Sequence, residues 1–314
     1  AGGRGPLKRQ RGADEMTKKK IEFIGSCLSD LLTEKEIIAR YELLQRVYDC
    51  VRRADLSPEE KDELEETLGK KNVASGIFFN VLSGEPIFIN LPKLDSVMKI
   101  NERVFHFVHT GCYADPDFAR AFNQFKESER EVEELVRLNL RDLLVEFMAG
   151  AGYALADGSP GSGKLTFVGS GEKKLDFWIF PSIQDAELVE GMERSVVIVP
   201  HAESPGPFIS FFQEKGKAAD LAEIKVWVAN MEEGTIDPFI GYPKESRPFY
   251  HRLALAFGSP NYITESSACY AATFIAANYN LPFDVEAFAQ AGKHLLKSVE
   301  HDIGWMYETL HTDG

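Results

Sequence analysis

Four short apolar runs between residues 164 and 228 constrain the fold of this chain more than any other feature of the sequence. The runs read KLTFV, LDFWIF, SVVIV and EIKVWV. Their length and their β-branched and aromatic content are typical of strands, and nearly continuous apolar character indicates burial on both faces of a sheet. A helical pattern, PFISFFQEKGKAADL, separates the last two runs. This order predicts a mixed β-sheet with helical cover.

The segment before the first run has the spacing of a phosphate-binding loop. Gly158, Gly163 and Lys164 fit that spacing, but Leu165 stands where a magnesium-binding Ser or Thr is required. A phosphate loop also needs a helix directly after it. KLTFV and LDFWIF instead predict two antiparallel strands joined near Gly169, so the segment is not interpreted as a nucleotide site.

Helical patterns dominate the chain before this sheet. Thr33 with Glu36 has capping-box spacing and predicts a helix over residues 37–51. A second capped helix is predicted over residues 57–69, with proline in its first turn and glycine at its end. The longest helical pattern covers residues 115–150. A further short helix is expected in DAELVEGM, residues 185–192.

Two weaker patterns lie between these helices. Residues 77–90 alternate around Ser83-Gly84-Glu85 and predict a β-hairpin, IFFNV against PIFIN. His106 and His109 follow, with a spacing that permits a shared metal ion or one helical face. Since no nearby Asp, Glu or Cys completes a ligand set, half-buried core histidines are the preferred interpretation.

The patterns together predict an α+β protein: a helical N-terminal region, then a mixed β-sheet with helical cover and a helical C-terminus. The basic, glycine-rich residues 1–20 are expected to form a disordered tail. A mainly helical domain with one β-hairpin is expected over residues 21–150, and an α/β-type mixed-sheet domain with C-terminal helices over residues 151–314. The glycine-rich stretch from residue 150 to 163 marks the boundary.

Composition narrows the partner classes. A formal net charge of −14 opposes binding to nucleic acid and to anionic membranes, because phosphate contacts come from Lys and Arg. The 4 cysteines contain no C-x-x-C pair, which favours reduced thiols and a cytoplasmic location. No apolar run approaches the roughly 20 residues that span a bilayer. We therefore expect a soluble protein.

The order of elements over residues 131–229 resembles the core of the restriction-endonuclease-like fold. In that family an Asp on one strand and a carboxylate-x-Lys on the next hold magnesium and position water. The resemblance implies a divalent-metal phosphodiesterase or nuclease in which Asp176 and Glu223 bind Mg²⁺ and Lys225 stabilises developing charge. The alternative is that Glu223 and Lys225 share the exposed face of an edge strand.

A second resemblance lies near the C-terminus. The turn Gly258-Ser259-Pro260-Asn261, followed by Cys269 at a helix start, is similar to molybdopterin oxidoreductases, in which such a cysteine ligates molybdenum. The resemblance implies a small-molecule or metallocofactor site formed by Gly258, Ser259, Asn261 and Cys269. The alternative for Cys269 is a buried structural cysteine.

The leading functional interpretation is a non-catalytic intracellular protein that binds a protein or small-molecule partner. No complete catalytic set can be assembled from the sequence, and the acidity disfavours nucleic acid. Phe118, Phe122 and Phe125 form a stripe at helical spacing. We interpret this stripe as core, with docking of a partner helix as the alternative.

Overall fold

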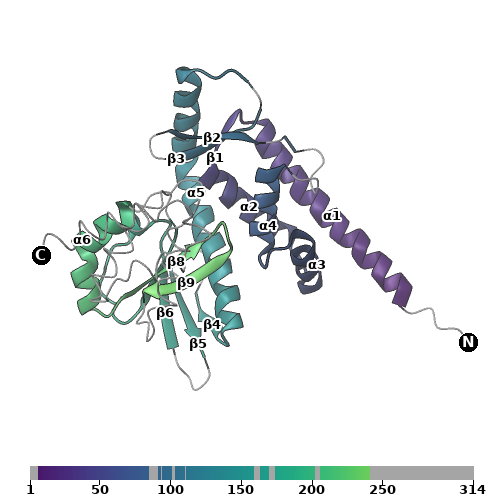
Figure 1. Ribbon diagram of the computed structural model, residues 1–314. Helices are drawn as coiled ribbons and strands as arrows, with labels where there is room; N and C mark the ends of the chain where they lie inside the picture. Colours follow the sequence, from purple (N-terminus) through teal and green to yellow (C-terminus); the bar gives the residue numbers. More distant parts are fainter. Residues whose placement is uncertain are drawn as a thin grey trace, which may run out of the picture. The chain divides into compact units, whose positions relative to one another are not determined.

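The computed structural model describes residues 6–84, 91–92, 94–100, 103–109, 111–158, 163–169, 174–201 and 206–240, whose elements are labelled in Figure 1. These residues form an α+β fold in two compact units, as predicted at the level of fold class. The first unit contains the chain up to Leu135 together with Glu232–Gly234, and the second begins at Val136. The boundary thus falls inside a helix and before the glycine-rich stretch. The expected C-terminal helices lie outside the described residues.

The first unit combines helices with a small antiparallel sheet. The strand order is β1-β3-β2, and β3 pairs with both neighbours. Its elements in chain order are α1 (Pro6–Thr33), β1 (Ile37–Ala39), α2 (Arg40–Ala54), α3 (Pro58–Leu68), α4 (Val73–Ser83), β2 (Asp95–Ile100), β3 (Arg103–Phe107) and the first part of α5 (Asp115–Gly150).

The start of the first unit differs from the prediction at two points. Helix α1 begins at Pro6, within the segment expected to be a tail. The predicted capping box is wrong, because Thr33 ends α1 and its hydroxyl donates to the Ser29 carbonyl at 2.7 Å. Residues 37–39 pair with β3 as a strand, so the next helix starts only at Arg40. The apolar Ile37 and Ile38 satisfy a strand as well as a helix, and tertiary pairing decides between them.

Of the next two helices, α3 was predicted correctly from its capping residues and α4 was not. In α3 the Ser57 hydroxyl accepts from the Glu60 N–H at 3.2 Å, and the Glu60 carboxylate accepts from the Ser57 N–H at 2.8 Å. This confirms the predicted capping box. The predicted strand over residues 77–81 is wrong, because these residues belong to α4. Asn72 caps α4, and Gly84 ends it in the left-handed conformation, with φ of 67°.

The core of the first unit draws side chains from its helices and from its small sheet. Helices α1, α2 and α4 supply aliphatic and aromatic side chains, β3 supplies Phe105, and α5 supplies Phe125. The rings of Phe105 and Phe125 meet edge to face, with centroids 6.2 Å apart. Other side chains with almost no exposure are Ile24, Leu28, Leu32, Leu43, Val47 and Phe78.

The second unit contains a mixed sheet of six strands in the order β4-β5-β6-β7-β8-β9. Neighbours from β4 to β6 are antiparallel, β6, β7 and β8 are parallel, and β9 returns antiparallel to β8. The predicted hairpin between the first two apolar runs is confirmed. The strands are β4 (Ala154–Asp157), β5 (Lys164–Val168), β6 (Lys174–Ile179), β7 (Val196–Pro200), β8 (Lys225–Asn230) and β9 (Thr235–Ile240).

Helices cover the central strands of this sheet. Helix α6 (Gly206–Leu221) connects β7 to β8, and all five residues of β7 are buried. On the other side, Phe147 of α5 meets Trp227 of β8 with ring centroids 6.0 Å apart. Figure 1 shows α6 and the end of α5 on different sides of the strands. The strand order and directions confirm the predicted mixed sheet.

Three finer predictions in the second unit are wrong. Residues 185–192 do not form an α-helix, since only a short 3-10 turn, η3 (Ile183–Asp185), is present there. Strand β8 begins at Lys225, so Glu223 lies before it. Strand β8 is also not an edge strand, because β7 and β9 flank it. Among the described residues, none of the helices has the length and apolar character needed to cross a membrane.

Candidate functional site

Asp176, the first predicted metal ligand, lies on β6 with its carboxylate already bonded. It accepts a hydrogen bond from the Thr166 hydroxyl at 2.7 Å and pairs with the Lys164 ammonium at 2.8 Å. Partial burial acts to raise the pKa of Asp176, but hydrogen bonds from Lys164 and Thr166 outweigh burial and hold the pKa below its ordinary value. The carboxylate is therefore ionised and bonded within one hairpin.

Glu223 and Lys225 lie at the start of β8, where both make contacts with the segment before β7. Glu223 has a φ of 55°, and its carboxylate pairs with the guanidinium of Arg194 at 3.1 Å, with 79% and 61% of the Arg194 and Glu223 side chains exposed. The Lys225 N–H donates to the Ser195 carbonyl at 3.0 Å. The two residues thus fix the turn from α6 into the sheet.

Strand register separates Asp176 from Lys225. Phe177 pairs with Val196, and Val196 pairs with Lys225 across parallel strands, so these three side chains share one face of the sheet. Asp176 is the neighbour of Phe177 in β6 and lies on the other face. In the part of the chain that the structure describes, no group of three or more His, Cys, Asp or Glu side chains is placed to hold a metal ion. The structure does not bring the predicted magnesium site together.

The remaining predicted site residues are those of the C-terminal cofactor site and the two histidines. Gly258, Ser259, Asn261 and Cys269 lie outside the described residues. His106 and His109 diverge, because His106 is buried in β3 while His109 is exposed beyond its end. His106 Nε2 lies 3.1 Å from Nη1 of the buried Arg40. Since a guanidinium only donates, this ring nitrogen accepts and His106 is neutral.

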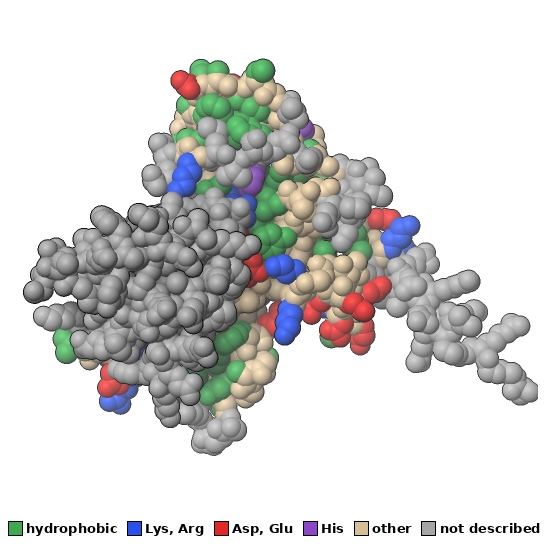
Figure 2. All heavy atoms as spheres, in the orientation of Figure 1, with side chains coloured by type: hydrophobic (Ala, Val, Ile, Leu, Met, Phe, Trp, Pro, Cys, Tyr) green, Lys and Arg blue, Asp and Glu red, His purple; other side chains and the backbone are tan. Residues whose placement is uncertain are grey.

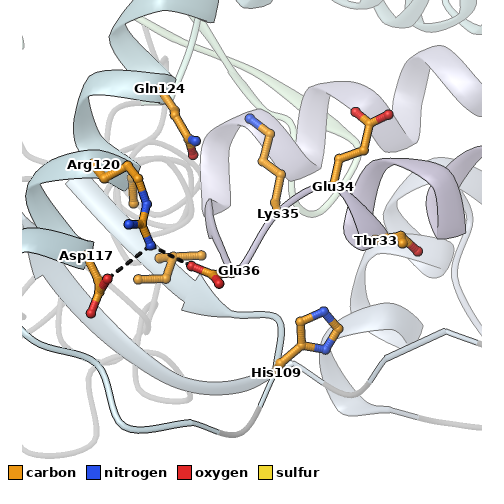
Figure 3. A pocket seen from close by; sticks show the side chains of 10 residues that line it. Thr33, Glu34, Lys35, Glu36, His109, Asp117, Arg120 and Gln124 are labelled. Carbon is orange, nitrogen blue, oxygen red and sulfur yellow. Dashed lines mark hydrogen bonds and ion pairs between the residues drawn. The ribbon is translucent and has the colours of Figure 1, made fainter.

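A polar cavity of about 570 Å³ lies in the first unit, between the end of α1, the loop before β1 and the first turns of α5. Figure 3 shows the side chains of Glu36, Asp117 and Arg120 pointing toward one another. The Arg120 guanidinium is 2.7 Å from Glu36 and 3.0 Å from Asp117. The lining residues are Thr33, Glu34, Lys35, Glu36, Ile37, His109, Asp117, Arg120, Ala121 and Gln124.

Carboxylates dominate the electrostatics of this polar cavity. Three line it, against two basic side chains, and both basic groups already have acidic partners. Lys35 donates to both oxygens of Glu42, each at 2.9 Å. The pKa of the neighbouring Tyr113 is raised by burial and then by the negative charges of Glu36 and Asp117. The polar cavity therefore favours a cationic group over an anion.

An apolar cavity of about 440 Å³ opens on the same helix, lined by Ile100, Asp115, Phe118, Ala119, Phe122 and Asn123. Phe118 and Phe122 are half-buried and pack against a core that includes Phe125. Phe107 stacks on Tyr113 at 4.8 Å and meets Phe118 edge to face at 6.2 Å. On the face shown in Figure 2, apolar side chains gather over the start of α5. Of the predicted stripe, Phe125 is core, whereas Phe118 and Phe122 keep exposed edges.

Sequence reasoning missed the polar cavity, because its members come from three distant segments. Glu36, His109 and Arg120 belong to no shared local pattern. The only sequence signal was the mixing of aromatic and charged residues in DPDFARAFNQF, which departs from a purely core-facing helix. That signal indicates that this face of the helix is unusual, but it does not indicate which residues from other segments lie against it.

The fold and these cavities define an α+β protein with a polar and an apolar cavity on one helix. Residues 183–251 match a family described as a domain of unknown function (DUF6834), C-terminal domain. A search of the curated proteins found no match to the chain. The matched segment starts at η3 and includes β7, α6, β8 and β9. Neither cavity lies within it.

Proposed function

We propose that this chain is a non-catalytic binding protein and that the first three turns of α5 dock a partner segment carrying apolar and basic side chains. The observation that supports this proposal is the pairing of two unlike cavities on one helix. An apolar cavity lies beside Phe118 and Phe122, and a carboxylate-rich cavity lies beside Asp117 and Arg120.

The apolar cavity supplies the affinity in this proposal. Half-buried aromatic rings offer large contact areas and few rotatable bonds, so a side chain from a partner buries apolar surface there at a small entropic cost. Phe118 is held by Phe107, which is itself stacked on Tyr113. A surface held in this way is preorganised for binding.

The polar cavity supplies the selectivity. A lysine or arginine of the partner meets Glu34, Glu36 and Asp117, while an acidic side chain meets their repulsion. The net charge of −14 adds a long-range attraction for basic segments. The partner is therefore expected to be a peptide segment with aromatic or aliphatic anchors flanked by Lys or Arg.

Selection of a displayed library of short random peptides against the purified chain tests this proposal. We expect enrichment of peptides that combine an apolar anchor with Lys or Arg. Ala119, which is exposed on the wall of the apolar cavity, is changed in Ala119→Arg to fill that cavity without removing a core ring. This variant is expected to weaken the selected peptides at least about ten-fold.

Two further variants complete the test. Glu36→Gln removes a carboxylate that is 64% exposed, and it is expected to weaken binding about two- to ten-fold and to reduce its salt dependence. Leu221→Ala, at a leucine of the second unit that is 84% exposed, serves as the control and is expected to leave affinity unchanged. Absence of enriched peptides, or equal binding to Ala119→Arg and wild type, would contradict the proposal.

A further inference from the structure

Helices α1 and α2 pack as an antiparallel pair whose register is fixed by two contacts. The Lys20 ammonium donates to the carbonyls of Ala54 and, at 3.1 Å, Asp55. The Arg53 guanidinium lies 5.8 Å from the centre of the Phe23 ring. Moving toward the C-terminus along α1 therefore corresponds to moving toward the N-terminus along α2.

This register places Cys27 opposite Cys50. Cys27 lies one turn after Phe23 on α1, and Cys50 lies one turn before Arg53 on α2. Residues three or four positions apart share a helix face, so the two thiols occupy the next facing position of the pair. Both cysteines are free thiols, with Cys27 half-buried and Cys50 buried.

We propose that Cys27 and Cys50 form a reversible intramolecular disulfide when the chain meets a hydroperoxide such as hydrogen peroxide. Neither cysteine lines either cavity, so the inference is independent of the binding proposed above. The two side chains already interact in the reduced protein, because a side-chain hydrogen bond with Cys27 is among the causes that raise the pKa of Cys50.

The reaction balances with hydrogen peroxide as the oxidant. The Cys27 sulfur attacks one peroxide oxygen and the O–O bond breaks, which gives a sulfenic acid on Cys27 and releases water. The Cys50 sulfur then attacks the Cys27 sulfur, the S–O bond breaks, and a second water leaves with the Cys50 proton. Two thiols and one peroxide thus become one disulfide and two waters.

The surroundings assign these two roles. Burial, and then the neighbouring Cys27, raise the pKa of Cys50 to about 12, so Cys50 stays protonated at neutral pH. The thiolate is the nucleophile toward peroxide, and the half-buried Cys27 is the accessible sulfur. Cys27 therefore reacts first and Cys50 resolves the sulfenic acid, which traps Cys27 before further oxidation.

Non-reducing peptide mapping tests the proposal on the purified full chain. The reduced protein is treated with hydrogen peroxide, blocked with N-ethylmaleimide and digested with trypsin. We expect a linked pair of peptides, residues 21–35 with residues 47–52, that disappears on reduction with dithiothreitol. The oxidised protein is also expected to melt at a temperature higher by on the order of 5 °C.

Two variants keep the result specific. Cys112→Ser removes an exposed thiol and is expected to leave the linkage intact. The double variant Cys50→Ser, Val51→Cys turns the α2 thiol by roughly 100° around the helix and is expected to give at least ten-fold less linked peptide. Wild-type protein in which Cys27 reaches the sulfinic acid without linkage, or equal linkage through Val51→Cys, would overturn the proposal.

Discussion

The guanidinium of Arg40 binds the carboxylate of Glu232 through two hydrogen bonds, of 2.7 Å from Nε to Oε1 and 2.8 Å from Nη2 to Oε2. The two side chains are only 2% and 5% exposed. The Phe78 ring centre lies 5.0 Å from the guanidinium carbon, and the Ser75 hydroxyl donates to the Glu232 carbonyl. The two opposite charges compensate each other in the interior of the first unit.

Glu232→Gln is expected to lower the free energy of unfolding by about 3 kcal/mol, because it removes the carboxylate that binds the buried Arg40 charge through two hydrogen bonds. Urea denaturation followed by circular dichroism measures the loss. Glu223→Gln is the matched control, since it breaks the exposed pair with Arg194 and is expected to change stability by less than about 0.5 kcal/mol. Equal effects of the two substitutions would argue against a stabilising role for the buried pair.

Acid is expected to destabilise the first unit through His106. Burial, and then the Arg40 charge, lower the pKa of His106 to about 4, below the unfolded value of about 6.5. Between these values the unfolded chain binds more protons, so the contribution of His106 to stability is complete above pH 6.5 and is lost as the pH falls toward 4. Its size is on the order of 3 kcal/mol.

The pH effect is measured as the difference between wild type and His106→Gln, because carboxylates also titrate in this range. Gln offers an acceptor to Arg40 but does not titrate. The free energy of unfolding of the variant is expected to depend less on pH between 6.5 and 4. Parallel pH profiles for the two proteins would refute the assignment to His106.

Wild-type protein is expected to show no magnesium-dependent cleavage of DNA or RNA, single- or double-stranded. Two carboxylates that share a cation each lie within roughly 2.0 to 2.6 Å of it, whereas Asp176 is bonded within the β5–β6 hairpin and lies on the sheet face opposite Lys225. End-labelled oligonucleotides with and without Mg²⁺ provide the assay. Cleavage by wild type that is lost in both Asp176→Asn and Lys225→Ala would reverse this expectation.

Ser57→Ala is expected to cost about 1 kcal/mol, because it removes the acceptor of the Glu60 N–H at the start of α3. Thermal unfolding monitored by circular dichroism detects the change. Thr67→Ala in the same helix is the control: its hydroxyl donates to the Glu63 carbonyl one turn back, which adds little to helix stability. A loss for Thr67→Ala as large as that for Ser57→Ala would contradict the capping explanation.

Local sequence predicted those elements whose ends are fixed by their own residues. Ser57 and Glu60 define α3 without help from the rest of the chain, and α5 follows from a long helical period. The prediction was wrong for residues 77–81, where IFFNV suits a strand or a buried helix equally. There the signals of Asn72 and Gly84 at the two helix ends were decisive.

The positions of the candidate site residues relative to one another depend on tertiary structure. Glu36 and Arg120 meet across 84 residues of sequence, and only packing places His109 beside them. Lys225 and Asp176 both lie in strands, as predicted, but a side chain's face depends on register through the intervening β7. A shift of one residue reverses that face, and the sequence carries no local signal for it.

The inclusion of Glu232 in the first unit bears on how the chain is made. Arg40 leaves the ribosome 192 residues before its partner, which corresponds to about 10 to 40 s of synthesis at 5 to 20 residues per second. During that interval the nascent first unit carries a cation with no carboxylate from Glu232. The first unit therefore completes its fold only after most of the second has been translated. A fragment that ends after α5 would lack the Glu232 carboxylate permanently.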